Sequence, residues 1–195
     1  MASIALGQWR TVGLARLDEL EQVHSAATRD RGGSSWGTAQ LNRGLFVALV
    51  AQFQTFCRSL HDEAVAVHVA RTNPRQAAVL DKLMTEGRRL NSQNPRAGHL
   101  GSDFGRLGFS LVDELKRSEP AVADWLRDLD LLIDFRNAVG HGDETKIAAL
   151  TSTAGIRATK ASYRSFRRTL DRLAGTMDAV VGSALAAGLQ IPRPW

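Results

Sequence analysis

The residues whose types and spacing could do chemistry lie within positions 134–143. Arg136 and His141 have four residues between them, Asn137 follows the arginine directly, and glycines flank the histidine. Imidazole takes or gives a proton near neutral pH, and guanidinium stays charged and matches phosphate oxygens with paired N–H groups. These groups suit chemistry on a phosphate. The imidazole can move a proton there, and the guanidinium stabilises charge that develops at phosphorus.

The helix that positions these residues is marked by its periodicity. Pro120 lies near its start, with Ser118 as the N-cap. Apolar residues then recur at three- and four-residue steps, namely Val122, Trp125, Leu126, Leu129, Leu132 and Ile133. Arg136 continues this stripe, and an adjacent polar stripe contains Asp130, Asp134, Asn137 and His141. We expect both stripes to face other structure, where such polar groups pair with one another or do chemistry.

Arg136 and His141 do not lie side by side on a regular helix. Five positions at about 100° each leave roughly 140° between the two side chains. Gly140 and Gly142 permit the helix to end or distort at the histidine, and a second copy of the helix across a two-fold axis is the other way to complete the pair. We favour the dimer.

Arg136-Asn137 followed by His141-Gly142, at the end of an amphipathic helix with another long helix after it, resembles the HEPN superfamily (higher eukaryotes and prokaryotes nucleotide-binding) and within it the RiboL-PSP branch. In that family two long helices pack against the motif helix, and a short segment leads into a closing helix. The same order fits residues 41–189. The resemblance implies an all-α, HEPN-like helical bundle with two long antiparallel helices plus shorter helices.

The resemblance also implies an activity. A HEPN protein of this type is a metal-independent endoribonuclease that cleaves tRNA or mRNA at a composite active site formed by a homodimer, as a toxin or an antiviral-defence effector. The resemblance implies that Arg136 contacts the scissile phosphate and that His141 transfers a proton. Asn137 would position either Arg136 or His141. An antitoxin or regulatory partner protein is expected. HEPN toxins paired with nucleotidyltransferase antitoxins carry a tyrosine where this chain has Asp143, so an antitoxin that modifies such a tyrosine is not expected.

Other readings of the motif stay open. Arg136 could bond Asp134 or a carbonyl at the helix end while His141 merely caps the helix. Asp134 and Asp143 could each support the site by orienting His141, or could only neutralise Arg136. At the level of function, the alternative is a non-catalytic HEPN-like module that binds RNA, nucleotide or a partner protein. A third reading is an unrelated helical bundle with a chance motif.

Two further patterns bear on ligands. The last helix carries a basic stripe of Arg164, Arg167, Arg168 and Arg172, which either holds an RNA backbone or forms a solvated face. His61 and His68 share a helix face, but no pair of histidines lies four residues apart and no His/Cys cluster completes a metal site. We therefore expect no metal and no cofactor.

The composition bears on the number of domains, the partners and the compartment. The chain has 195 residues, 44% of them hydrophobic, which suffices for one core and gives no reason for two domains. The net charge of +5 favours acidic partners such as RNA. The lone cysteine, Cys57, fits a reducing cytoplasm, and we expect no signal peptide and no membrane-spanning segment.

The remaining periodic segments predict a single domain over residues 1–195, with its core at about 41–189 and an N-terminal helical extension at about 11–28. A Gly/Ser-rich loop is expected at 30–37 and a loop able to touch substrate at 91–101. After the motif we expect a small hairpin. Its two strands would be residues 146–150 and 155–158. The other expected helices cover residues 41–71, 74–90, 103–117 and 161–187.

Overall fold

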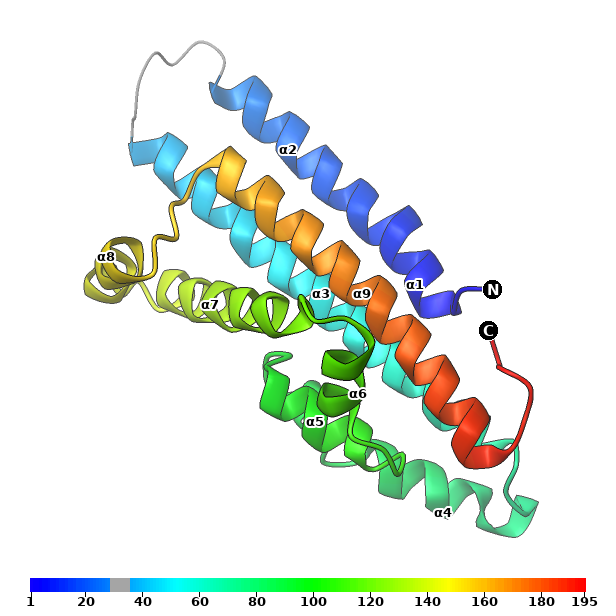
Figure 1. Ribbon diagram of the computed structural model, residues 1–195. Coiled ribbons are helices and arrows are strands. Elements are labelled where there is room, and N and C mark those ends of the chain that lie inside the picture. The colour runs from blue at the N-terminus through cyan, green and yellow to red at the C-terminus, as the bar shows by residue number, and fades with distance from the viewer. Residues whose placement is uncertain (29–35) are drawn as a thin grey trace.

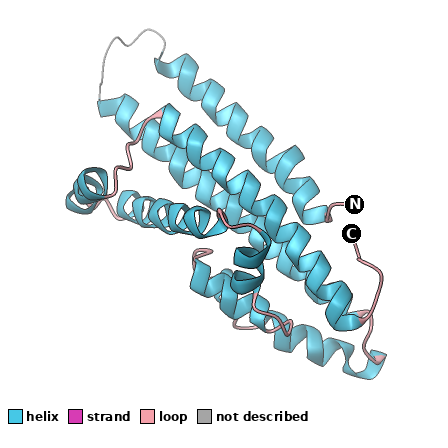
Figure 2. Ribbon diagram, viewed as in Figure 1, coloured by secondary structure: helices cyan, strands magenta, loops and turns pink. Residues whose placement is uncertain are grey.

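The computed structural model describes residues 1–28 and 36–195, so the loop predicted at 30–37 falls mainly outside the described residues. Within these ranges the chain forms helices and connecting loops and no strand (Figures 1 and 2). The all-α prediction is therefore confirmed. None of the helices within the described ranges combines the length and apolar character that a membrane crossing requires.

Two long helices form the spine of the bundle. They are α3 (Trp36–Val69) and α9 (Lys160–Leu189), and they run side by side in the same direction (Figure 1). Near their starts the rings of Phe46 and Phe166 meet edge to face, with centroids 6.1 Å apart. The prediction that the long helices are antiparallel was therefore wrong. The physical reason is the crossover formed by residues 70–159, which returns the chain to the start of α3 before α9 begins.

The antiparallel partner of both long helices comes from the N-terminus. It consists of α1 (Ile4–Gln8), a π-helical turn η1 (Trp9–Gly13) and α2 (Leu14–Thr28). Its first backbone N–H groups are held by the spine, because Ser3 N donates to Asp178 of α9 at 3.1 Å. The helical segment thus begins at Ile4 rather than at residue 11.

This N-terminal segment is part of the core and not an extension of it. Leu6, Trp9 and Leu17 are all buried. The Trp9 indole packs edge to face on Phe53 at 5.8 Å, and its N–H donates to Asp171 at 3.0 Å. Removing the segment would expose one side of α3 and α9.

The crossover contains the shorter helices. These are α4 (Pro74–Thr85), the 3₁₀ turn η2 (Arg89–Asn91), α5 (Ala97–Gly105), α6 (Leu111–Ser118), α7 (Val122–Gly140) and α8 (Glu144–Thr153). The predicted helix at 103–117 is split, because Gly108 has a φ of +88° that breaks the helical path. Ser118 ends α6 instead of capping the motif helix, whose N-cap is Ala121.

The hairpin predicted after the motif helix was wrong, since its first strand lies within α8. Asp143 starts this helix as its N-cap, with its carboxylate accepting from the Lys146 N–H at 2.9 Å. Arg43 of α3 donates to both carboxylate oxygens of Glu144, at 2.5 and 2.8 Å, and so ties the start of α8 to the spine.

A buried polar cluster joins α3 to the crossover. The Nδ1 atom of His61 lies 2.9 Å from a guanidinium nitrogen of Arg88, and its Nε2 atom lies 3.0 Å from the backbone oxygen of Asp103. Because guanidinium only donates and a carbonyl only accepts, the imidazole is neutral with its proton on Nε2. The same guanidinium also donates to Asp62 and Asn91. Burial lowers the pKa of His61.

The His61→Gln variant should show a smaller loss of stability on acidification than the wild type. The unfolded chain binds a proton at His61 more readily than the folded chain does. The stability contributed by the neutral His61 is therefore fully present above a pH of about 6.5 and is lost as the pH falls below that value. The glutamine amide can replace both hydrogen bonds without titrating. Urea unfolding at pH values from about 7 to about 5 measures the difference, and parallel curves for the two proteins would contradict it.

Candidate functional site

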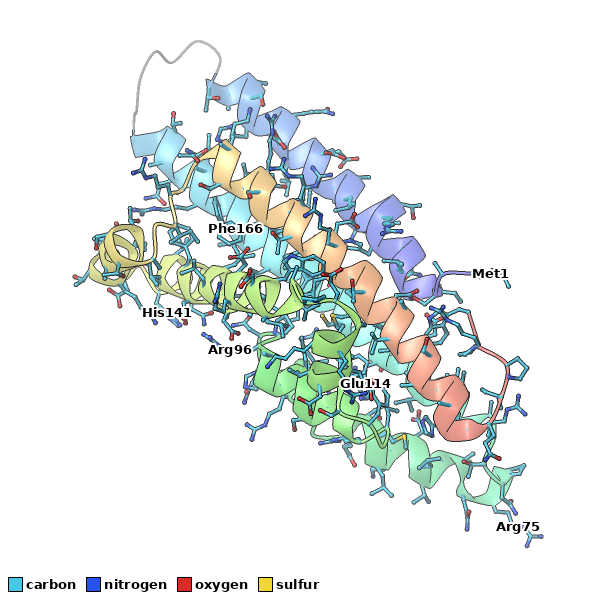
Figure 3. The ribbon with its side chains drawn as sticks, in the orientation of Figure 1. Met1, Arg75, Arg96, Glu114, His141 and Phe166 are labelled. Atoms are coloured by element: carbon cyan, nitrogen blue, oxygen red, sulfur yellow. The ribbon has the colours of Figure 1, made fainter. Side chains whose placement is uncertain are left out.

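The sequence motif lies at the C-terminal end of α7, which packs its apolar stripe between α3 and α9. Phe135 and Ala138 are buried, whereas Arg136 and Asn137 are half-buried at the edge of this interface. His141 is exposed at the end of α7, next to α8 (Figure 3). The motif therefore occupies the boundary between the core and the surface.

The end of α7 is a Schellman motif. Asp143 N–H donates to the Ala138 carbonyl at 2.9 Å, and Gly142 N–H donates to the Val139 carbonyl at 3.2 Å. Gly142 takes the left-handed conformation, with φ of +65°, whereas His141 is still right-handed. The helix thus stays regular through His141, and the angle of roughly 140° between the arginine and histidine side chains remains.

The two glycines of the motif should respond to alanine in opposite directions. Gly142→Ala is expected to destabilise the protein by about 1 kcal/mol, because a side chain disfavours positive φ. Gly140→Ala is expected to stabilise it by about 0.5–1 kcal/mol, since the position is helical and an added Cβ meets nothing within 4 Å. Urea unfolding of both variants tests this, and an equal effect of the two would contradict it.

Asn137 connects the motif to a distant segment. Its Oδ1 atom accepts from Arg136 Nη1 at 3.2 Å and from Asn94 Nδ2 at 3.0 Å. Asn94 precedes α5, and its backbone oxygen lies 2.8 Å from Nδ1 of His99 in the first turn of that helix. The structure therefore brings the predicted loop at 91–101 against the motif, with four polar side chains in one connected group.

Arg136 has no carboxylate partner among the described residues. Within the described part of the chain its one hydrogen bond is to a neutral amide oxygen, although the side chain is half-buried. It forms no hydrogen bond or ion pair there with Asp134 or with a carbonyl at the helix end, the two partners that the sequence left open. The guanidinium thus keeps its charge uncompensated and most of its N–H groups free to bind an anion.

The two aspartates of the motif have other partners in the protomer. Asp134 accepts from Arg96 at 2.5 Å, and Asp130 lies 3.9 Å from the same guanidinium. Asp143 caps α8. In the structure as described, neither the Asp134 nor the Asp143 side chain forms a hydrogen bond or ion pair with Arg136 or His141. Their role is to hold neighbouring segments against the motif: the segment before α5 in the first case and α8 in the second.

The segment before α5 is fixed from two sides. Gln54 of α3 donates to the Gln93 carbonyl at 2.8 Å, and Pro95 is buried. On the other side Asn94 and Arg96 bond α7, as described above. The sequence predicted this stretch only as a loop able to touch substrate. The polar types of Asn94, Arg96 and His99 were the available signal.

The basic stripe on α9 divides into two pairs. Arg164 bonds Glu21, and Arg167 donates to Asp18 at 2.6 Å, so these two hold α2 to α9. Hydrogen bonding to Arg167 lowers the pKa of the Asp18 carboxyl. Arg168 and Arg172 are exposed, and no ion pair joins their side chains to other described residues. Of the four arginines in the stripe, this second pair therefore has no ion-pair partner among the described residues.

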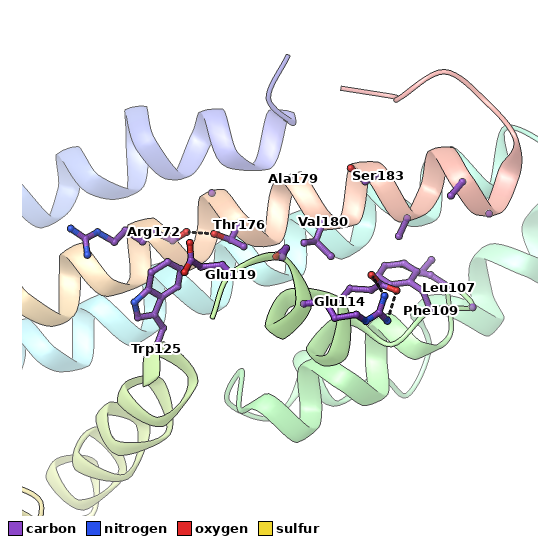
Figure 4. Close-up of a pocket in the computed structure, with 17 residues that line it drawn as sticks. Leu107, Phe109, Glu114, Glu119, Trp125, Arg172, Thr176, Ala179, Val180 and Ser183 are labelled. Atoms are coloured by element: carbon purple, nitrogen blue, oxygen red, sulfur yellow. Dashed lines mark hydrogen bonds and ion pairs between the residues drawn. The ribbon is translucent and has the colours of Figure 1, made fainter. Parts of the chain in front are cut away.

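A large apolar groove lies away from the motif. It has a volume of about 1040 Å³ and runs between α6, α9 and the start of α7, with Phe109, Trp125 and Val180 in its wall (Figure 4). Its charged groups include Glu114 and Arg117, which pair with each other. None of the lining residues is a histidine or a cysteine. The groove therefore suits apolar contacts, with Glu114, Arg117, Glu119 and Arg172 as its charged groups.

No cluster of three or more His, Cys, Asp or Glu side chains that could hold a metal occurs in the described part of the chain. Comparison with family models, with curated proteins and with solved structures finds no match. The candidate functional residues are those at the end of α7.

Proposed function

We propose that the end of α7 is the active site of a metal-independent endoribonuclease of the HEPN type. One observation carries the proposal. Arg136 is half-buried without a carboxylate partner among the described residues, its guanidinium bonds Asn137, and the exposed imidazole of His141 follows five positions after the arginine on its own face of the helix end. A partly desolvated guanidinium without a carboxylate partner is suited to bind a phosphodiester, and an exposed imidazole is suited to move a proton on it.

Each residue of the motif has a defined task in this reaction. Arg136 contacts the nonbridging oxygens of the scissile phosphate and stabilises the charge that builds there in the transition state. His141 transfers a proton, since an imidazole is the side chain best matched to proton transfer near neutral pH. Asn137 positions Arg136, because its amide oxygen accepts from that guanidinium.

The active form is a homodimer with a composite site. Within one protomer α7 is regular through His141, so Arg136 and His141 diverge by roughly 140° around the helix. An exposed histidine at a helix end is accessible to a second copy of the chain, and a two-fold axis near this end pairs Arg136 of each copy with His141 of the other. We place Arg168 and Arg172 on the path of the bound RNA.

The biological setting follows the HEPN resemblance. The substrate is tRNA or mRNA in the cytoplasm, and the enzyme acts as a toxin or an antiviral-defence effector held in check by an antitoxin or regulatory partner. The positive net charge of +5 suits an RNA substrate. The buried, unpaired thiol of Cys57 suits a reducing compartment.

Cleavage of labelled total RNA and tRNA in EDTA tests the activity. The wild type should cut, and the His141→Ala variant should lose at least about 100-fold in rate. His68→Ala is the matched control, because His68 lies near the far end of α3. Cutting that persists in His141→Ala would contradict the assignment of His141.

The second candidate function is a non-catalytic HEPN-like module. It is favoured by the free imidazole of His141, which has no orienting hydrogen bond from the described residues of its own protomer. Such a module binds RNA or nucleotide through Arg136 without turnover. Absence of cutting by a folded dimer, together with RNA binding that Arg136→Ala abolishes, would support it.

A further inference from the structure

The first turn of α5 carries a second imidazole, that of His99, which bonds into the group around Asn137. His99 bonds the backbone oxygen of Asn94, and the Asn94 side chain bonds Asn137, whose amide oxygen also accepts from Arg136. Three hydrogen bonds thus lead from His99 to the guanidinium proposed to bind phosphate. All of these groups belong to one protomer.

The hydrogen bond of His99 determines its tautomer. A backbone carbonyl only accepts, so Nδ1 of the neutral ring must carry the proton that bonds Asn94 at 2.8 Å. Nε2 then holds a lone pair, and it has no hydrogen bond to any described residue. An imidazole whose Nδ1–H is held by a fixed acceptor and whose Nε2 is free has the arrangement of a general base.

The position of His99 is secured by its neighbours. Arg96, three residues earlier, is paired with Asp134 of α7, and Gln54 of α3 holds the carbonyl of Gln93. The side chain is half-buried, so part of it remains accessible to a ligand. A base must be held within hydrogen-bond reach of the proton that it takes, and these contacts reduce its freedom to move.

We propose that His99 is the general base of the ribonuclease reaction and that His141 is the general acid. The proposal rests on the proposed function. RNA transesterification needs two proton transfers, one to a base and one from an acid. The motif of Arg136 and His141 contains one imidazole per protomer, and His99 supplies a second.

The chemical step balances with these two groups. Nε2 of His99 takes the proton of the 2′-hydroxyl while O2′ forms a bond to phosphorus. The bond from phosphorus to O5′ breaks, and O5′ receives a proton from the His141 imidazolium. The products are a 2′,3′-cyclic phosphate and a 5′-hydroxyl. Proton exchange with water returns both rings to their starting states.

The decisive variant is His99→Asn. An asparagine side chain can place its Nδ2–H where His99 has Nδ1–H and so keep the bond to the Asn94 carbonyl, but it cannot accept a proton. We expect His99→Asn to lower kcat by at least about 100-fold with little change in melting temperature. His99→Ala removes both functions and serves as the comparison.

Two measurements separate a base from a structural residue. The wild-type profile of kcat/KM against pH should be bell-shaped, and His99→Asn should lose the rise on its acidic side. A substrate with sulfur in place of the 5′-bridging oxygen needs no acid, because a thiolate leaves unaided. This substrate should bring His141→Ala to within about tenfold of the wild type and leave His99→Asn impaired.

The outcomes distinguish this inference from the proposed function. If the wild type does not cut RNA, the proposed function itself fails. If the wild type cuts and depends on His141, but His99→Asn cuts within about threefold of the wild type, the assignment of His99 is overturned and the ribonuclease stands. Restoration of His99→Asn by the sulfur substrate would also overturn its role as the base.

Discussion

Arg136→Lys is expected to lower the rate of RNA cleavage by about 10²–10³-fold while the melting temperature stays within about 1 °C of the wild type. The planar guanidinium matches two phosphate oxygens at once, whereas an ammonium group offers a point charge. Stability should change little, because the side chain makes one hydrogen bond, at 3.2 Å, to a neutral oxygen. Steady-state kinetics and thermal unfolding measure the two effects.

Arg127→Lys is the control for this variant. Arg127 lies on the same helix, is exposed and forms a surface ion pair with Asp124. Its replacement should leave the cleavage rate within about twofold of the wild type. If both substitutions lowered the cleavage rate equally, the rate would depend on the guanidinium groups of α7 without regard to their position. This result would contradict a specific phosphate contact at Arg136.

Asp103→Ala is expected to lower the free energy of unfolding by about 3 kcal/mol. The Asp103 carboxylate is fully buried and accepts from the N–H groups of Arg89 at 2.9 Å and Leu90 at 2.7 Å. Alanine would leave both donors without a partner and open a cavity. Because these donors lie in the turn that leads to the segment before α5, the loss should also loosen that segment. Urea unfolding measures the change.

Asp81→Ala provides the matched comparison. Asp81 is an exposed residue of α4, and its replacement should change the free energy of unfolding by less than about 0.5 kcal/mol. A loss below about 1 kcal/mol for Asp103→Ala would contradict the role assigned to the buried carboxylate.

Local patterns predicted the helices well where the periodicity was long. The apolar spacing in residues 41–71 and 161–187 indicated the two spine helices, and the structure places them at Trp36–Val69 and Lys160–Leu189. Their relative direction was not predictable in this way. Amphipathic helices bury the same stripe whether the neighbour runs parallel or antiparallel, and the outcome depends on how far the crossover carries the chain.

Short elements were harder to predict because their ends depend on single residues. Residues 146–150 contain isoleucine, alanine and leucine, which also fit a strand, but the capping carboxylate of Asp143 and the left-handed Gly142 favour a new helix directly after α7. At the N-terminus, Glu63 of α3 accepts from the N–H groups of Ile4 and Ala5. The contact with Glu63 leaves no local signal, but Ser3 does, since its hydroxyl caps the helix by accepting from the Leu6 N–H at 3.0 Å.

Sequence patterns predicted only the part of the candidate site that lies within one helix. Arg136, Asn137 and His141 follow from spacing within one helix. The contacts of Asn94 with Asn137 and of Arg96 with Asp134 join residues about forty positions apart, and they exist because the segment before α5 lies against α7 in the folded chain. Asp134 is therefore satisfied by a tertiary contact, whereas Asp143 is satisfied locally as the N-cap of α8.

The most direct test of the central claim is the identity of the ends left on an RNA cut by the wild-type protein in EDTA. Attack by the 2′-hydroxyl, with Arg136 on the phosphate and His141 transferring a proton, predicts a 2′,3′-cyclic phosphate on one fragment and a 5′-hydroxyl on the other. The same oligonucleotide with 2′-deoxyribose at the cut position should remain intact. Fragments with 5′-phosphate and 3′-hydroxyl ends, or cutting of the deoxy substrate, would require an external water nucleophile and would contradict the account.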